Sequence, residues 1–235
     1  AGAPRTHARV YADDHARAAV LHSVAQPLAQ VDAAGLHYRA LYRSANTAHG
    51  LGGDWYSVLN LDGRRTYLAV GDVLGHGLTA VEDMAQLRSA GNAYAHLGLM
   101  PARVLAELDR LANRVSRAEF ATSAVAVFDP GTGVLTYSSA GHPPPLLRSA
   151  ATGAVIRLDA ARGPVLGLLD DVGYSESTVQ VADGDVLVMY SDGLVEHDEY
   201  DIQAGITHLE RVIANWPPDA LLDCEALAED VAPTP

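Results

Sequence analysis

The chain has 235 residues, 49% of them hydrophobic, which suits a single globular domain with one sizeable core. Acidic side chains outnumber basic ones by 29 to 16, and every basic one is Arg, so the net charge of -13 argues against nucleic acid and anionic membrane surfaces as partners. The lone Cys224 excludes an intrachain disulfide and a thiol-ligated zinc site, and no apolar run reaches the ~20 residues of a membrane span, so we expect a cytoplasmic protein without membrane insertion.

The first 34 residues are expected to form a helix and a linker. Apolar residues recur at helical spacing from Asp13 to Val31. This helix has two interpretations: it packs on the core of the domain, or it joins the domain to an upstream sensor and offers a surface for a homodimer. We therefore divide the chain into residues 1–34 and a domain at residues 35–235, and the start at Ala1 without Met suggests a piece of a longer protein.

A hairpin and two long helices are predicted next. Segments with strand character, Trp55 to Leu61 and Tyr67 to Val70, are joined by a turn at Asp62-Gly63. Apolar residues at helical spacing then predict one helix after Gly77, and Pro101, a favoured first helical residue, begins a second. The predicted core positions are Ala80, Met84, Leu87, Gly91 and Tyr94 in the first helix, and Val104, Leu105, Leu108, Leu111 and Val115 in the second.

Short strands and tight turns dominate the rest of the chain, which closes with helices at Ile202 to Ile213 and Asp219 to about Val231. Hairpins in series with helices inserted between them predict an α+β fold, in which two antiparallel β-sheets pack face to face as a sandwich flanked by helices. The predicted strands are Phe120 to Phe128, Val134 to Ala140, Leu146-Leu147, Val155 to Leu158, Val179 to Val181 and Val186 to Tyr190.

Asp54, Asp72 and Asp192 share a setting, because each lies at one end of an apolar strand and next to glycine. A carboxylate partly removed from water is costly unless a positive charge meets it, and Arg is scarce near all three. An all-oxygen ligand set suits Mg²⁺ or Mn²⁺ rather than zinc, and two such ions can activate water and bind a phosphoryl group. The simpler interpretation is that these are ordinary Asp-Gly turns.

Four motifs taken together favour the metal site over the turns. They are Gly52-Gly53-Asp54-Trp55-Tyr56, Gly71-Asp72-Val73-Leu74-Gly75-His76-Gly77, Ser139-Ala140-Gly141-His142-Pro143-Pro144-Pro145 and Tyr190-Ser191-Asp192-Gly193-Leu194. In this order and spacing, from about Tyr38 to Ile213, the chain resembles the SpoIIE/RsbU branch of the PPM metal-dependent serine/threonine protein phosphatases.

The resemblance implies an αββα sandwich with two Mn²⁺ or Mg²⁺ ions at one edge. Asp72 would bridge both ions, Asp54 and the Val73 carbonyl would complete one site, and Asp192 would belong to the other. The implied reaction is direct attack of metal-activated water on a phosphoserine or phosphothreonine. The implied partner is a phosphorylated anti-sigma-factor antagonist of the STAS type.

One departure from the family pattern concerns the C-terminal part of the chain. Family members end with a strand that carries a further metal-binding Asp, and this sequence stops before such a strand. Glu229-Asp230-Val231-Ala232 resembles the motif superficially, but no apolar strand follows it. We therefore expect a domain that lacks the C-terminal strand, and a non-catalytic interaction module with the same fold stays an alternative to the enzyme.

Other candidate residues and site types are less well supported. His76 suits a general acid by its ordinary pKa, or is a loop histidine beside the metals; His142 is predicted to be structural, and Arg43 is only a guess for a phosphate anchor. A Ser-His-Asp hydrolase lacks its Gly-x-Ser-x-Gly turn. A Walker A site lacks its Lys, and a dinucleotide fold lacks its Gly-x-Gly-x-x-Gly spacing.

Overall fold

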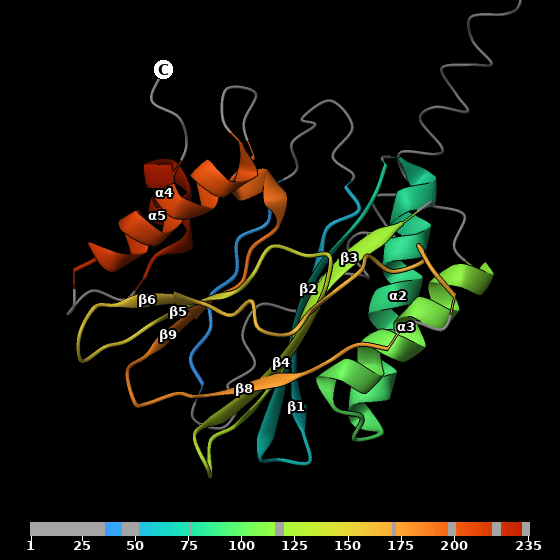
Figure 1. The fold of residues 1–235 in the computed structure, drawn as a ribbon, viewed down its shortest axis with the longest axis horizontal. Helices are drawn as coiled ribbons and strands as arrows, with labels where there is room; N and C mark the ends of the chain where they lie inside the picture. The colour runs from blue at the N-terminus through green and yellow to red at the C-terminus, as the bar shows by residue number, and fades with distance from the viewer. Residues whose placement is uncertain are drawn as a thin grey trace, which may run out of the picture.

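The computed structural model describes residues 36–43, 52–75, 77–115, 120–170, 173–196, 201–217 and 222–231. The predicted N-terminal helix lies outside these residues, and with it the boundary at residue 34 and the dimer surface; His76 lies outside them too. The described residues form two β-sheets, each with a pair of helices on its outer side (Figure 1).

The larger sheet is built from hairpins. Its main strands run in the order β1 (Trp55–Leu61), β2 (Arg65–Val73), β3 (Ala121–Asp129) and β4 (Val134–Ala140), all antiparallel. The Arg64 N–H donates to the Leu61 carbonyl at 3.1 Å, and the central residues of this turn, Asp62 and Gly63, have φ of 48° and 73°, the left-handed conformation that is favoured in hairpin turns. The hairpin predicted at Asp62-Gly63 is confirmed.

The far edge of this sheet is mixed. Strand β8 (Ser177–Gln180) pairs antiparallel with the first half of β4, and β7 (Arg162–Gly163) pairs parallel with its last two residues. The chain leaves β4, passes through the second sheet and returns beside β4 in the same direction, which gives the parallel pair. The prediction of purely antiparallel sheets is wrong for β7.

The smaller sheet has three antiparallel strands in the order β6 (Val155–Arg157), β5 (Leu146–Arg148) and β9 (Val186–Val188). The strand predicted to reach Tyr190 ends two residues earlier. A 3₁₀ helix, η1 (Asp192–Leu194), follows this strand closely. The segment between β9 and η1 therefore leaves the smaller sheet and turns towards the larger one.

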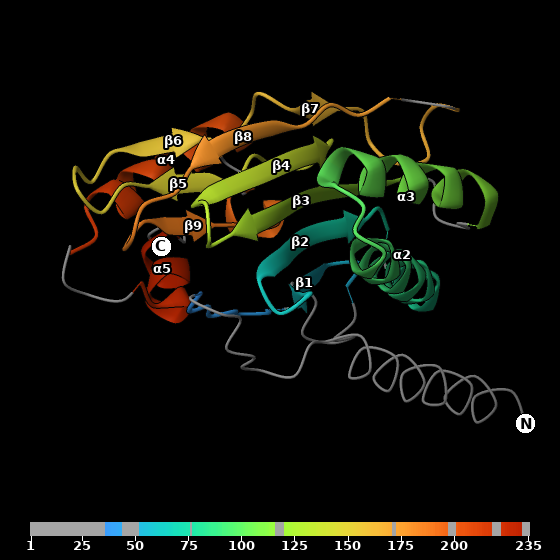
Figure 2. The same cartoon turned by 90° about the horizontal axis from the view of Figure 1, so that it is seen from below.

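Helices α2 (Leu78–His96) and α3 (Pro101–Val115) cover the larger sheet, and α4 (Ile202–Ala214) and α5 (Cys224–Val231) belong to the smaller one (Figure 2). Each interface between layers has its own apolar core. Members of the three cores are Met84, Leu105, Leu108 and Val125 between the larger sheet and helices α2 and α3; Leu68, Ala126, Tyr137 and Leu147 between the sheets; and Leu146, Ile206, Leu209 and Ile213 between the smaller sheet and α4. The described layers follow the predicted order of helix, sheet, sheet and helix.

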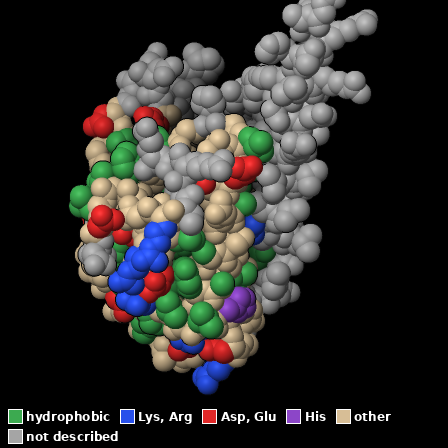
Figure 3. Space-filling model, turned by 90° about the vertical axis from the view of Figure 1, so that its right-hand side faces the viewer, with side chains coloured by type: hydrophobic (Ala, Val, Ile, Leu, Met, Phe, Trp, Pro, Cys, Tyr) green, Lys and Arg blue, Asp and Glu red, His purple; other side chains and the backbone are tan. Residues whose placement is uncertain are grey.

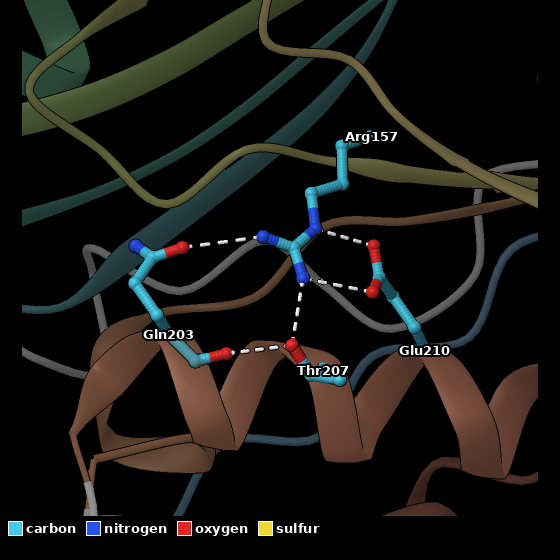
Figure 4. Close-up of polar contacts among 4 residues, drawn as sticks. All are labelled: Arg157, Gln203, Thr207 and Glu210. Carbon is cyan, nitrogen blue, oxygen red and sulfur yellow. Dashed lines mark hydrogen bonds and ion pairs between the residues drawn. The ribbon is translucent and has the colours of Figure 1, made fainter.

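A polar cluster fixes α4 on the smaller sheet (Figure 4). Arg157 of β6 donates two hydrogen bonds to the Glu210 carboxylate, one to Gln203 Oε1 at 3.2 Å and one to Thr207 Oγ1 at 3.0 Å. These three partners lie one turn apart along α4, so a single guanidinium spans two turns of the helix. The contacts of Arg157 thus fix the position of α4 over β6.

The last described helix, α5, includes Glu229, Asp230 and Val231, which are therefore helical and not part of a strand. Asp223 caps this helix by accepting from the Glu225 and Ala226 backbone N–H groups. In the described part of the chain, no helix is both long enough and apolar enough for a bilayer crossing. On the face shown in Figure 3, Arg side chains lie beside acidic ones, and on α3 Arg103 and Arg110 both pair with Glu107.

Candidate metal centre

Asp54, Asp72 and Asp192 converge at one end of the two sheets. One carboxylate oxygen from each lies within 4.8 Å of the others. Asp54 immediately precedes β1, Asp72 is the penultimate residue of β2, and Asp192 begins η1 after the smaller sheet. The site therefore needs both sheets, because neither supplies all three side chains.

Gly53 makes the close approach of the first two carboxylates possible. The Val73 N–H donates to the Gly53 carbonyl at 3.2 Å, outside the regular strand pairing. A Cβ at position 53 would lie 2.3 Å from the Val73 carbonyl oxygen and 3.0 Å from Asp72 Oδ1. Only glycine fits there, and the Val73 carbonyl, predicted as a ligand, lies beside the backbone that carries Asp54.

Two of the three carboxylates, Asp54 and Asp72, have raised pKa values. Burial raises the pKa of Asp72, and the negative charges of Asp54 and Asp192 add to it, which brings this pKa to about 8. Burial also raises the pKa of Asp54, against hydrogen bonds from Asp72 and from Ser191, whose Oγ donates to Asp54 Oδ2 at 3.2 Å. None of the ion pairs found among the described residues involves these carboxylates.

This arrangement fits a divalent cation. Three half-buried carboxylates without a positive partner among the described ion pairs repel one another, and a hard cation removes that repulsion while using oxygen ligands. Because residue 53 is glycine, it places no Cβ against the Val73 carbonyl and the Asp72 carboxylate. The described residues therefore provide a site with the donor atoms that Mg²⁺ and Mn²⁺ prefer.

Tyr42 is a neighbour of the cluster that the sequence did not indicate. Its phenol has a raised pKa because of burial and the negative charges of Asp54 and Asp72, opposed by a hydrogen bond from the Gly52 backbone. Tyr42 lies in a stretch without helix or strand, so no periodic pattern marks it. Arg43, the guess for a phosphate anchor, is exposed.

His142 is buried between the sheets, with 2% of its surface exposed. Its Nδ1 lies 2.7 Å from Thr122 Oγ1 and its Nε2 lies 3.0 Å from the Tyr190 carbonyl oxygen. Burial lowers the pKa of His142 to about 4, so the ring is neutral near pH 7. These contacts agree with the structural role predicted for this residue.

The fold, with its two sheets and their outer helices, is that of solved PP2C phosphatase domains. Within that class, the family model of stage II sporulation protein E (SpoIIE) matches residues 62–234. The chain belongs to the SpoIIE family. The match contains Asp72, Val73 and Asp192, and Asp54 lies just ahead of it.

The similar proteins include two named phosphoserine phosphatases. The chain is 31% identical over 150 residues to phosphoserine phosphatase RsbU of Bacillus subtilis, covering 63% of this chain and 44% of that protein. The crystal structure of the RsbU and RsbW domains of Rv1364c from Mycobacterium tuberculosis has a TM-score of 0.68 at 30% identity, covering 80% of this chain and 51% of that one. RsbX crystallised with magnesium has a TM-score of 0.61 at 18% identity, covering 81% and 83%.

These values show that the chain is homologous to phosphoserine phosphatases. They also show that it spans under half of the length of RsbU and about half of the Mycobacterium chain.

Proposed function

We propose that this chain is the catalytic domain of a metal-dependent protein serine/threonine phosphatase. Asp54, Asp72, Asp192 and the Val73 carbonyl would hold two Mn²⁺ or Mg²⁺ ions. Such ions supply a hydroxide at neutral pH and neutralise charge on a phosphoryl group. The observation that carries the proposal is the convergence of three carboxylates, far apart in sequence, within 4.8 Å.

The residues of the chain have separate tasks in this proposal. The negative charges of both Asp54 and Asp192 act on Asp72, so Asp72 lies where it would help to hold either ion. Ser191 orients Asp54 through its 3.2 Å hydrogen bond. The Tyr42 phenol lies beside Asp54 and Asp72, where it can donate to an oxygen of the bound phosphoryl group.

For the substrate, we propose a phosphoserine or phosphothreonine on an anti-sigma-factor antagonist of the STAS type. The support is the identity to RsbU, which is named a phosphoserine phosphatase, and the likeness to a chain that joins RsbU and RsbW domains. His76 stays a candidate general acid outside the described residues.

The proposal is tested by Mn²⁺-dependent release of p-nitrophenol from p-nitrophenyl phosphate. We expect Asp72→Asn to lower kcat/KM at least 100-fold, and Asp54→Asn and Asp192→Asn to lower it at least 10-fold, because each removes a charge that holds an ion. Asp183→Asn is the matched control, since Asp183-Gly184 is an exposed Asp-Gly turn away from the cluster. Equal activity in Asp72→Asn and Asp183→Asn would refute a catalytic role for the cluster.

A second candidate function is a non-catalytic interaction module with the phosphatase fold. It is favoured by one observation: among the described residues, the acidic cluster holds three carboxylates and Asp230 lies on α5, not on a strand beside them. This candidate predicts binding of the phosphorylated STAS partner without release of phosphate. Single-turnover assays at saturating Mn²⁺ distinguish a non-catalytic module from a phosphatase.

A further inference from the structure

We propose that His142 is a positioning residue, whose buried ring sets the distance between Asp72 and the segment that carries Ser191 and Asp192. The inference rests on the proposed function, because it assigns His142 to the assembly of the metal site. The side chain lies in the connection from β4 to β5, the point at which the chain crosses from the larger sheet to the smaller one.

One side of the ring is attached to the larger sheet. His142 Nδ1 lies 2.7 Å from Thr122 Oγ1, and Thr122 of β3 is the cross-strand partner of Asp72 in β2. The ring therefore contacts the residue directly beside Asp72. Ser139 Oγ of β4 donates to the His142 carbonyl at 3.1 Å, which fixes the His142 backbone to the same sheet.

The other side of the ring holds the segment that leaves the smaller sheet. His142 Nε2 lies 3.0 Å from the Tyr190 carbonyl oxygen, two residues after the end of β9. The next residue is Ser191, which donates to Asp54, and Asp192 follows. The Tyr190 hydroxyl is buried without a hydrogen-bond partner, so it is the Tyr190 backbone that has a polar anchor here.

The hydrogen bonds have a defined direction. A carbonyl oxygen only accepts, so Nε2–H donates to Tyr190, and the Nδ1 of a neutral ring then accepts from the Thr122 hydroxyl. Both sites of the ring are used, one for each sheet. The bond from the ring to the Tyr190 carbonyl is buried, which disfavours its replacement by water, and the bond to the Thr122 hydroxyl is partly buried.

A shift at Tyr190 moves Asp192 with it. The Val195 and Glu196 N–H groups both donate to the Asp192 carbonyl at 2.7 Å, so η1 is a short rigid unit that begins at Asp192. An apolar side chain at position 142 would fill the space but leave the Tyr190 carbonyl and the Thr122 hydroxyl unpaired, which disfavours the present backbone position. We infer that Asp192, and Ser191 with it, then moves away from Asp54 and Asp72.

This role is tested by measuring Mn²⁺ binding directly. The electron paramagnetic resonance signal of the free ion monitors the binding. We expect His142→Phe to raise the Mn²⁺ Kd at least 10-fold, the effect typical of losing a group that orients a metal ligand. His142→Gln, whose amide N–H can still donate to Tyr190, is expected to recover part of the affinity. Thr122→Val is expected to give a smaller rise than His142→Phe.

If His142 had a purely structural role, replacing it would lower the stability of the protein without changing the Mn²⁺ Kd. Leu135→Ala is the matched control, since Leu135 of β4 is buried and pairs with Phe128, at the end of β3 away from Thr122. It is expected to lower the melting temperature and leave the Kd unchanged.

The outcomes separate this inference from the proposed function. A Kd within twofold of the wild type in folded His142→Phe would overturn the positioning role alone. Absence of Mn²⁺ binding by the wild-type protein would overturn the metal site and the positioning role together. If His142→Phe does not fold, Thr122→Val decides, and an unchanged Kd in this folded variant overturns the inference.

Discussion

At the scale of single residues, the site depends on Gly53 as much as on the carboxylates. In the sequence, the Asp-Gly and Gly-Asp pairs at positions 54, 72 and 192 look like ordinary turns. The Gly53-Asp54 pair is distinguished by its packing, because a Cβ at position 53 would lie 2.3 Å from the Val73 carbonyl oxygen. The motifs predicted the three carboxylates that converge. They could not reveal Tyr42, because that contact depends on where an irregular segment lies in space.

Replacing Gly53 by Ala is therefore expected to separate Asp54 from Asp72. The added methyl forces the backbone near Val73 to move, which should lower the free energy of unfolding by about 1–3 kcal/mol and weaken Mn²⁺ binding. Chemical denaturation and Mn²⁺ titration measure both effects. Gly173→Ala is the control, because a Cβ there meets nothing within 4 Å. Equal behaviour of the two variants would show that the space at Gly53 is not needed.

The buried His142 predicts an acid sensitivity of folding. Its pKa is lowered to about 4 in the folded protein and is near 6.5 when unfolded, so between these values the unfolded state binds the extra proton and stability falls as pH falls. From pH 7 to pH 5 this loss should be about 2 kcal/mol. Urea denaturation of the wild type and of His142→Phe, both with EDTA, measures it as the difference between the two pH dependences. Parallel curves would contradict it.

At the scale of elements, the hairpins and the long helices follow from the sequence pattern. The β1–β2 turn, α2, α3 and α4 lie where alternation, helical spacing and Pro101 indicate. Two features do not follow. The parallel pairing of β7 depends on the path through the second sheet, and the end of β9 at Val188 depends on the Tyr190 carbonyl bonding to His142 in place of a neighbouring strand.

The attachment of α4 to β6 predicts a stability effect without a metal effect. Arg157 binds Glu210, Gln203 and Thr207, so Arg157→Ala removes a charge-assisted pair and leaves part-buried acceptors unpaired (Figure 4). We expect a loss of about 1–3 kcal/mol in the free energy of unfolding and an unchanged Mn²⁺ Kd. Denaturation and Mn²⁺ titration test this. A large change in Kd would mean that α4 influences the carboxylates.

At the scale of the whole molecule, the two sheets together create the metal centre. Asp54 and Asp72 belong to the larger sheet, and Asp192 follows the smaller one, so the site exists only while the inter-sheet core of Leu68, Tyr137 and Leu147 is packed. The order of the four motifs in the sequence predicts the convergence of the three carboxylates, and the residues of the inter-sheet core do not. Binding of an ion to the folded state alone must stabilise that whole arrangement.

Metal ions should accordingly raise the melting temperature of the wild-type protein. Mn²⁺ at 100 times its Kd is expected to add about 2.7 kcal/mol to the free energy of unfolding. Asp72→Asn should show no such gain, because it lacks the central ligand, and Asp183→Asn should show all of it. Differential scanning calorimetry with Mn²⁺ and with EDTA gives the comparison. Equal stabilisation of Asp72→Asn would place the ion elsewhere.

The most direct test of the metal centre is the anomalous diffraction of crystals grown with Mn²⁺. Anomalous peaks are expected among the carboxylates of Asp54, Asp72 and Asp192, with the Val73 carbonyl among the ligands. Fully occupied Mn²⁺ at other positions, with these three side chains free of any ion, would contradict this prediction.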